Sequence, residues 1–309
     1  MIDGLFEQLQ RALRGRALRD EPMSRHTTWR VGGPADLFIE PADGEDLAET
    51  LRILAAAHCP WLTVGAGSNL LVKDGGIRGA VLHLTRLRRL EITDDGRVTA
   101  GAGLPLMTLI RATIARGLAG LEGLAGIPGT VGGGVVMNAG AGGQQLADVV
   151  EGATLVGPEG PEVWSRDRLA FGYRSSAVEA GQIISEARMR LHPGDPRHLA
   201  ETFAGRLAER AAAQRVGGPN AGSVFKNPPG ASAWRLIDGA GLRGAVEGSA
   251  RVAERHSNFI VTTKTAYAGD ILRLIERIRD QVRRQSGIEL ETEVKIVGED
   301  LCADVRGPT

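Results

Sequence analysis

The sequence predicts an α+β fold, in which short strands of mixed direction lie between helices. Several segments carry apolar residues at helical spacing between a capping residue and a terminating glycine. Short apolar runs are bounded by turn-forming residues, as strands are. Glycine accounts for 43 of 309 residues, about twice its average usage of about 7%, so many tight turns are expected.

The first segment predicts a β-α-β arrangement. Residues 2–13 have the apolar spacing of a helix, and a strand that ends at Pro41 follows the glycine–proline turn at 32–34. Asp43 is placed to cap a helix that runs to Ala57. The runs WLTV, LLV and AVLHL then predict short strands, the last of which ends near residue 84.

The middle segment predicts two short strands around the turn at 94–96, followed by a helix from Pro105 to the stop at Gly117. GATLVGPEGPEVW is typical of a hairpin, and QIISEARMRL is typical of a strand. The turn-forming run HPGDPRH marks a boundary at 192–198. We therefore expect segments 1–84 and 85–193 to be separate units.

The last segment, 198–290, predicts a helix over 198–215 and a second over 268–286 that ends at Gly287. The tail LETEVKIVG predicts a strand within 291–300 that returns to an earlier unit. No repeat of solenoid period is found.

Composition excludes several classes of protein. Lysine plus arginine and aspartate plus glutamate number 37 each, so the charge does not indicate a nucleic-acid or anionic-membrane partner. No secretory signal or membrane-spanning apolar run is present. Cys59 and Cys302 are isolated, which indicates neither a metal nor a redox pair and fits a reduced cytoplasmic location.

Familiar nucleotide and hydrolase motifs are absent. The sequence contains no Gly-x-Gly-x-x-Gly opening a helix after the first strand, no phosphate-binding Gly-x-x-x-x-Gly-Lys-Ser/Thr, no His-Glu-x-x-His and no Gly-x-Ser-x-Gly. A bound nucleotide would therefore be held in another way.

The run from Gly117 to Gly143 contains dense glycine with apolar residues between the glycines. Flexible linkers are polar, so a linker is the less favoured interpretation. Backbone laid against a large flat ligand with phosphates explains the run, because bare N–H groups can serve as donors. Further glycine turns at 65–69 and 101–103 are ordinary turns when taken singly, and together they favour the ligand interpretation.

Seven ordered motifs, from about residue 24 to 298, resemble those of the UDP-N-acetylenolpyruvoylglucosamine reductase family. They are TTWRVGGPADLFIEP, GAGSNLLV, GLEGLAGIPGTVGGGVVMNAGA, FGYRSS, AGSVFKNP, HSNFIV and LETEVKIVG. The resemblance implies a two-subdomain FAD-binding unit of the vanillyl-alcohol-oxidase type and a smaller α+β substrate-binding domain. It also implies noncovalent FAD, NADPH as hydride donor and reduction of UDP-N-acetylglucosamine enolpyruvate to UDP-N-acetylmuramate in peptidoglycan synthesis.

The glycine turns match those that lie along the flavin and its pyrophosphate in this family. The residues implied to bind the cofactor are Gly65, Ala66, Gly67, Ser68, Asn69, Gly101, Gly103, Ile127, Pro128, Gly129, Thr130, Gly132, Gly133, Asn138, Ala139 and Gly140.

Three further residues match catalytic positions. Arg174 is implied to bind the enolpyruvyl carboxylate, as a planar guanidinium can do with two hydrogen bonds. Ser223 is implied to donate a proton, and Glu293 to steady Arg174 or act as an acid. Without the resemblance, each has an ordinary alternative as a surface arginine, a turn serine or a solvated strand carboxylate.

The resemblance implies that Tyr173, Lys226, Asn227 and His256 contact the substrate, and it implies no metal. No long insertion is found in the last segment, so the chain resembles the shorter type of member, which lacks a tyrosine-bearing loop over the nucleotide. A monomer or weak oligomer is expected.

Two other functions compete with this one: a flavin oxidase on the same scaffold, and a catalytically silent flavin- or nucleotide-binding module. The isolated cysteines lie outside the glycine turns, which does not favour a tethered flavin oxidase. The joint presence of Arg174, Ser223 and Glu293 disfavours the silent module.

Overall fold

The computed structural model describes residues 2–179, 181–263 and 265–301; Cys302 lies outside them. The chain forms two compact units, each with its own apolar core. The first comprises Met1–Arg19, Leu37–Ala66 and Gly79–Ala211, and the second comprises Asp20–Asp36, Gly67–Arg78 and Ala212–Thr309. The three-segment division at about 84 and 193 stays a prediction.

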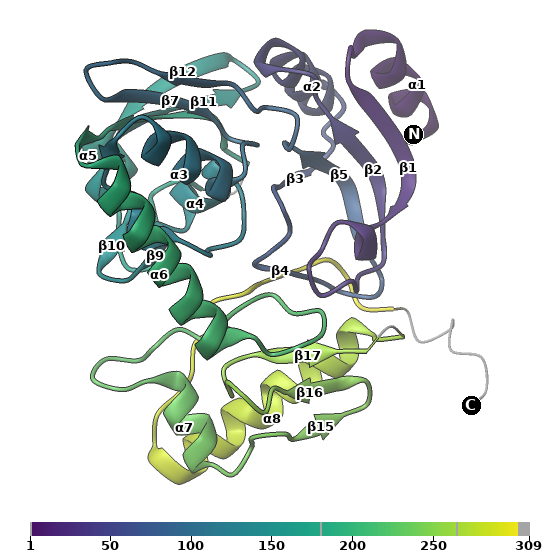
Figure 1. Ribbon diagram of the computed structural model, residues 1–309. Helices are drawn as coiled ribbons and strands as arrows, with labels where there is room; N and C mark the ends of the chain where they lie inside the picture. The colour runs from purple at the N-terminus through teal and green to yellow at the C-terminus, as the bar shows by residue number, and fades with distance from the viewer. Residues whose placement is uncertain (1, 180, 264, 302–309) are drawn as a thin grey trace. The chain divides into compact units, whose positions relative to one another are not determined.

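The first unit is built on two sheets (Figure 1). One sheet has the order β1-β2-β5-β3, with β1 (Arg16–Pro22), β2 (Pro34–Glu40), β5 (Ile77–His83) and β3 (Trp61–Val64). The other has the order β12-β11-β13-β7-β6, with β12 (Gly160–Ser165), β11 (Val150–Gly157), β13 (Ile183–Arg190), β7 (Arg97–Gly101) and β6 (Leu90–Ile92). Neighbouring strands of this second sheet are antiparallel.

The first unit also contains helices. They are α1 (Ile2–Ala12), α2 (Gly44–Ala56), α3 (Leu106–Ala115), α4 (Val131–Val136), the one-turn α5 (Arg166–Leu169) and most of α6 (Pro196–Gln214). Helix α4 packs against α3 and β13. Short pairs join β8 (Leu118–Ala119) to β14 (His192–Pro193) and β9 (Gly140–Ala141) to β10 (Gln144–Gln145), and the 3-10 turns are η2 (Glu122–Leu124) and η3 (Leu146–Asp148).

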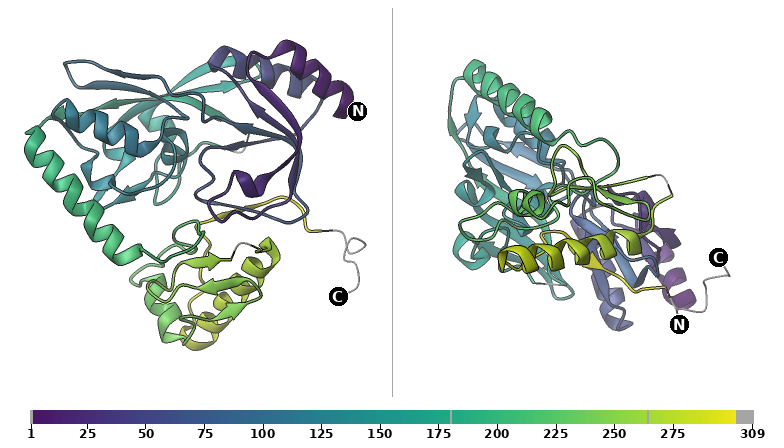
Figure 2. Two further views of the ribbon diagram at one scale, coloured as in Figure 1. Left: turned by 45° about the vertical axis from the view of Figure 1, so that its right-hand side comes forward. Right: turned by 90° about the horizontal axis from the view of Figure 1, so that it is seen from below.

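The second unit contains a small antiparallel sheet and two helices. Its elements are η1 (Met23–Arg25), α7 (Ala233–Gly239), α8 (Ala268–Ser286), and the strands β15 (Val246–Glu247), β16 (Ala250–Val252) and β17 (Ile260–Thr262). Helix α8 lies along this sheet (Figure 2). β18 (Lys295–Val297) pairs in parallel with β4 (Leu70–Val72), so the expected C-terminal strand is present but shorter than predicted.

Capping chemistry sets several helix ends where the sequence predicted them. The Asp43 carboxylate accepts hydrogen bonds from the N–H groups of Glu45 and Asp46, which starts α2. Gly287 ends α8 in the left-handed conformation at φ 71°, which glycine adopts without the penalty of a Cβ. Helix α8 buries an apolar face of Ile271, Leu274, Ile275, Ile278 and Val282. Both predicted helices are confirmed.

Trp29, in the motif TTWR, anchors an N-terminal segment in the core of the second unit. Its side chain is fully buried, and its indole Nε1 donates to the carbonyl of Ile260 at 2.8 Å. The hydroxyl of Thr262 donates in turn to the carbonyl of Trp29 at 3.0 Å. This segment is therefore tied to a strand more than two hundred residues away.

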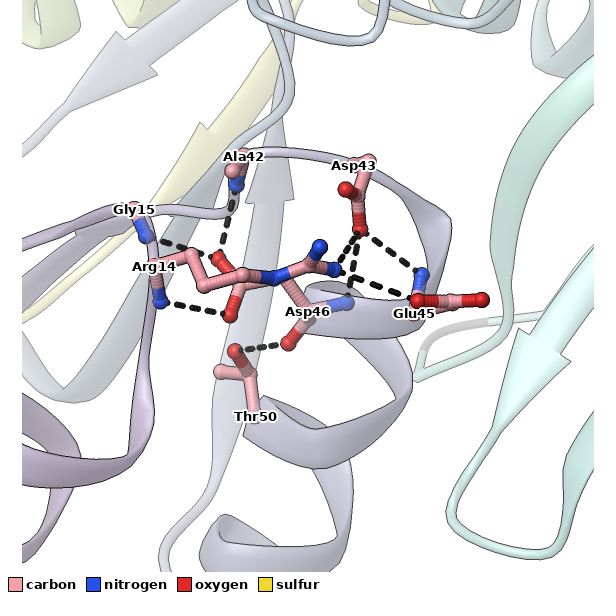
Figure 3. Close-up of polar contacts among 7 residues, drawn as sticks. All are labelled: Arg14, Gly15, Ala42, Asp43, Glu45, Asp46 and Thr50. Atoms are coloured by element: carbon pink, nitrogen blue, oxygen red, sulfur yellow. Dashed lines mark hydrogen bonds and ion pairs between the residues drawn. The ribbon is translucent and has the colours of Figure 1, made fainter.

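A buried carboxylate joins the turn after α1 to the start of α2 (Figure 3). Asp46 is 3% exposed and accepts hydrogen bonds from three backbone N–H groups, those of Arg14, Gly15 and Ala42, at 2.8–2.9 Å. The Arg14 guanidinium pairs with Asp43 and the exposed Glu45. Asp46 thus satisfies three backbone donors in part-buried positions.

No helix among the described residues is both long and apolar enough to cross a bilayer.

We predict that Asp46→Ala lowers the free energy of unfolding by about 3 kcal/mol, because it leaves three part-buried N–H groups without their acceptor. Chemical denaturation followed by circular dichroism measures the change. Glu45→Ala is the matched control, since its exposed ion pair contributes little. Equal stability of both variants would contradict the role given to Asp46.

Candidate functional site

The glycine-rich run is ordered structure and not a linker. It contains β8, η2, α4 and β9, of which α4 was not expected from the sequence. Val131 and Val135 of α4 are fully buried in the core of the first unit. The helix begins after Thr130, and the first two of its N–H groups donate to the carbonyls of Leu104 and Ala102. Packing and these bonds therefore hold a helix whose glycines disfavour it.

Part of the glycine content serves close packing of one backbone against another. An ideal Cβ on Gly103 would lie 1.8 Å from the carbonyl oxygen of Leu84. The N–H groups of Gly101, Gly103 and Gly132 already donate to carbonyls of the chain. These three residues shape the site and do not offer N–H donors to a ligand.

A different set of N–H groups is available. Those of Gly65, Ala66, Gly129, Thr130 and Gly133 have no hydrogen-bond acceptor in the described part of the chain. Gly133 is exposed, and a Cβ there would meet only the hydroxyl of Thr130 within 4 Å, at 3.6 Å. Unpaired donors beside such an open surface fit a phosphate-bearing group.

The other residues predicted at the cofactor are placed as follows. Ile127 is half-buried with its N–H bonded to Leu124, and Pro128 is exposed. The N–H groups of Asn138 and Ala139 close the end of α4. Gly67, Ser68 and Asn69 belong to the second unit.

Glu122 begins η2, the turn that precedes the 127–130 segment. Its carboxylate accepts from the N–H of Gly120 at 2.7 Å and from the amide of Gln144 at 3.0 Å. Burial raises the pKa of this carboxyl, but these donors outweigh burial and leave the pKa lowered. The ionised side chain therefore ties η2 to β10.

Arg174 lies in a tight turn of the first unit. The N–H of Gly172 donates to the carbonyl of Ser175 at 3.0 Å, and Arg174 has a φ of 54°, which is rare for a residue with a side chain. Its guanidinium lies over the Tyr173 ring at 5.1 Å and donates to the carbonyl of Gly140 at 2.8 Å. Such a backbone persists where neighbours over-determine it, which is common at functional sites.

Ser223 lies in an extended segment of the second unit that is bonded on both sides. On one side, Asn258 accepts from the N–H groups of Val224 and Phe225 and its side-chain amide donates to the carbonyl of Phe225. On the other side, the N–H of Glu293 donates to the carbonyl of Val224 at 2.8 Å. The Ser223 hydroxyl has no hydrogen-bond partner within residues 2–179, 181–263 and 265–301.

Glu293 is thus brought next to the Ser223 segment by backbone pairing. Asn69 also holds this segment: its amide donates to the carbonyl of Glu293 at 3.1 Å, and its carbonyl accepts from the N–H of Lys295 at 3.0 Å. Asn69 was predicted at the cofactor, and here it secures the segment that carries Glu293.

Lys226 and Asn227 follow directly. The Lys226 ammonium pairs with Glu291, a carboxylate to which the sequence assigned no role. The side-chain oxygen of Asn227 accepts from the N–H of Ala233 at 3.0 Å and so secures the loop before α7.

His256 is half-buried and packs edge-on against Phe259 with ring centroids 4.8 Å apart. Burial lowers the pKa of its imidazole, and the Asp238 carboxylate offsets this only in part. The buried Nδ1 of His256 has no hydrogen-bond partner in the described ranges. The ring is therefore neutral near pH 7, and its contact with a substrate stays a prediction.

Sequence reasoning missed the supporting residues Glu122, Asn258 and Glu291. Asn258 lies inside the motif HSNFIV, and its place next to a motif histidine was the one available signal. Within the described residues, no three His, Cys, Asp or Glu side chains are arranged to hold a metal ion.

Comparisons with known proteins agree with this description. The model of the UDP-N-acetylenolpyruvoylglucosamine reductase C-terminal domain matches residues 212–297, and the FAD binding domain model matches residues 35–165. UDP-N-acetylenolpyruvoylglucosamine reductase of Syntrophotalea carbinolica is 53% identical over 90% of this chain and 93% of its own length. That of Geobacter sulfurreducens is 50% identical over 97% of this chain and 100% of its own length.

A crystal structure of UDP-N-acetylenolpyruvylglucosamine reductase from Thermus caldophilus has a TM-score of 0.78 and 34% identity, and covers 92% of this chain and 99% of that chain. A berberine bridge enzyme variant, at 17% identity and a TM-score of 0.51, covers 63% of this chain and 44% of that chain and shares the fold alone. The fold is α+β, with an FAD-binding part of the vanillyl-alcohol-oxidase type followed by a smaller C-terminal domain. By its sequence over nearly the whole length and by its fold, the chain belongs to the UDP-N-acetylenolpyruvoylglucosamine reductase family.

Proposed function

We propose that the protein reduces UDP-N-acetylglucosamine enolpyruvate to UDP-N-acetylmuramate for peptidoglycan synthesis, with bound FAD and with NADPH as reductant. Family membership supports the reaction. The observation that carries it to named residues is the backbone pairing of Glu293 with Val224, which holds Ser223 and Glu293 on adjacent segments. A proton donor is needed when a hydride adds to an enol ether, because the α-carbon must then take up a proton.

The residues of the first unit fit a cofactor with phosphates, because Gly65, Ala66, Gly129, Thr130 and Gly133 have N–H groups without acceptors among the residues described. We propose that these groups hold the pyrophosphate and ring edge of FAD. FAD, when bound, supplies the hydride chemistry between NADPH and the enolpyruvyl group. The predicted segments 1–84 and 85–193 would provide the two FAD-binding subdomains, and 198–290 the substrate-binding domain.

Arg174 is proposed to bind the carboxylate of the enolpyruvyl group. Hydride addition to the β-carbon spreads negative charge into this carboxylate, and a guanidinium placed in advance stabilises that charge. The turn that holds Arg174 and its contact with the Tyr173 ring limit the motion of the side chain. Orientation before reaction is the condition for a large rate effect.

Ser223 is proposed to donate a proton to the α-carbon. A neutral hydroxyl is a weak acid, and it suffices only against the strongly basic enolate, whose charge Arg174 is proposed to stabilise while Glu293 steadies Arg174 or acts as an acid. The Ser223 hydroxyl makes no hydrogen bond to any other described residue, so it is available to a ligand.

Tyr173, Lys226, Asn227 and His256 are proposed to contact the nucleotide-sugar substrate. The protein is proposed to belong to the shorter type without a tyrosine-bearing loop, to be a monomer or weak oligomer, and to work in the cytoplasm, where the thiol of Cys59 stays reduced.

The direct test of the reaction is oxidation of NADPH by the purified protein with FAD and UDP-N-acetylglucosamine enolpyruvate. We expect NADPH absorbance to fall only when the enol ether is present, with a product heavier by two hydrogens in mass spectrometry. NADPH consumption that depends on oxygen and not on the enol ether would favour an oxidase instead.

We predict that Ser223→Ala keeps reduction of the bound flavin by NADPH but slows its reoxidation by the enol ether about 10²- to 10⁴-fold, the usual contribution of a positioned acid. Stopped-flow absorbance without oxygen measures the two half-reactions separately. Ser232→Ala is the control, because that serine lies in the same unit and its side chain caps no helix. An equal loss in both half-reactions would show that Ser223 is not the proton donor.

We predict that Gly133→Ala weakens FAD binding about tenfold, equivalent to about 1.4 kcal/mol, without destabilising the protein free of FAD. A Cβ at this helical position is sterically free in the chain, and alanine favours the helix. Flavin fluorescence titration and thermal unfolding measure the two effects. Gly205→Ala, at an open position of α6, is the control and should leave the dissociation constant unchanged; unchanged FAD binding in Gly133→Ala would place the cofactor elsewhere.

A further inference from the structure

The side chain of Asn138 is buried and engaged by the protein on every side. It is 1% exposed. Its amide donates to the side-chain oxygen of Gln145 at 3.0 Å and to the carbonyl of Gly172 at 2.9 Å, and its side-chain oxygen accepts from the N–H of Ala147 at 3.0 Å. Because both amide protons and the oxygen are taken, this side chain has little capacity left for a ligand.

One of these three bonds reaches the turn that carries Arg174. Gly172 and Ser175 are paired across that turn, so its geometry depends on where the carbonyl of Gly172 is held. A second tether comes from Ser176, whose hydroxyl donates to the carbonyl of Val136 at 2.9 Å. The turn is thus bound to the end of α4 from both of its sides.

The segment after α4 also accepts a hydrogen bond from the Arg174 guanidinium. Arg174 donates to the carbonyl of Gly140 at 2.8 Å, and an ideal Cβ on Gly140 would lie 3.1 Å from Arg174 Nη1. Asn138 has a φ of 41° and Arg174 has a φ of 54°, both in the left-handed region, which asparagine tolerates but which is rare for arginine. The unfavourable backbone of Arg174, tied by hydrogen bonds to the Asn138–Gly140 segment, indicates a geometry that is held for a purpose.

We propose that Asn138 is a positioning residue that acts through Arg174, and that the Asn138–Gly140 segment is a cradle for this arginine. This inference rests on the proposed function and deepens it. The sequence predicted that the Asn138–Gly140 segment lies along the cofactor, and here the segment is given the role of orienting Arg174. The Asn138 amide sets the Gly172 carbonyl, the turn sets the backbone of Arg174, and Gly140 leaves room for the guanidinium.

The test uses Asn138→Asp, which keeps the acceptor for the N–H of Ala147 and removes the amide that donates to the carbonyl of Gly172 and to the side chain of Gln145. We expect reoxidation of the reduced enzyme by the enol ether to slow about 10- to 100-fold, as for a misplacement of about 1 Å. Reduction by NADPH and the FAD dissociation constant should stay within about twofold of the wild type. Gln145→Ala removes only the bond between the Asn138 amide and the exposed residue Gln145, and it should leave both half-reactions unchanged within a factor of about two.

A double-mutant cycle separates positioning from a general structural role. In an Arg174→Ala background, Asn138→Asp should cause no further loss in the reoxidation rate, because its effect passes through the absent guanidinium. Full additivity would overturn the proposal, and so would an equal loss in both half-reactions or a weakened affinity for FAD.

A readout that needs no activity is cleavage by trypsin after Arg174. Loosening of the turn should raise the cleavage rate at this bond about tenfold in Asn138→Asp relative to cleavage after Arg168, and not in Gln145→Ala. Ser176→Ala, which releases the second tether, should act in the same direction and serves if Asn138→Asp does not fold. Unchanged proteolysis and unchanged reoxidation would overturn the proposal.

The inference and the proposed function fail in distinguishable ways. If the wild-type enzyme is not reoxidised by the enol ether, the proposed function fails and the inference falls with it. If the wild type is reoxidised and Asn138→Asp behaves like it, only the positioning role is overturned.

Discussion

The site in the first unit depends on the contact of two backbone segments at a distance that no side chain would allow. Gly103 lies against the carbonyl of Leu84, and its N–H donates to the carbonyl of Leu87. Gly132 lies against Ala102, whose carbonyl accepts its N–H. These contacts fix the start of α4, beside which the N–H groups of Gly129, Thr130 and Gly133 have no acceptor among the described residues. Glycine therefore acts here in two ways: Gly103 and Gly132 allow close backbone packing, and Gly129 and Gly133 leave N–H groups without an acceptor in the described chain.

The second unit holds the segment with the proposed proton donor, Ser223, in a comparable manner. Buried asparagine supports an extended segment there, as it supports a turn in the first unit. Asn258 holds the segment with Ser223, and Asn138 holds the turn with Arg174. An amide side chain suits this purpose because it donates and accepts at once and carries no charge that burial would penalise. The residues that act on the substrate are thus proposed to be held by partners that do not touch it.

Much of the fold was predictable from local chemistry. Asp43 and Gly287 mark helix ends by capping, and both helices lie where the sequence placed them. Helix α4 was not predictable, because three consecutive glycines disfavour a helix, and this is overridden by the burial of Val131 and Val135 together with the hydrogen bonds at the start of the helix. β1 was missed because RALRDEP lacks an apolar alternation, with a single buried residue along it.

The candidate site was likewise predictable only in part. The density of glycine predicted a ligand even without the family resemblance. The roles of Arg174 and Ser223 came only from that resemblance, since neither residue has a distinctive local pattern. The bonds from Asn138 to Gly172 and from Asn258 to Phe225 span more than thirty residues, so no local pattern predicts them. Hydrogen bonds of this range become visible only once the chain is folded.

The central claim is that glycines of the first unit fall into packing residues and cofactor-facing residues. Amide hydrogen exchange of the protein labelled with ¹⁵N-glycine tests it directly. Without FAD, the N–H groups of Gly65, Gly129 and Gly133 should exchange fast and those of Gly101, Gly103 and Gly132 slowly, and FAD should slow the first group alone. Exchange at Gly129 and Gly133 that is unaffected by FAD would contradict the account.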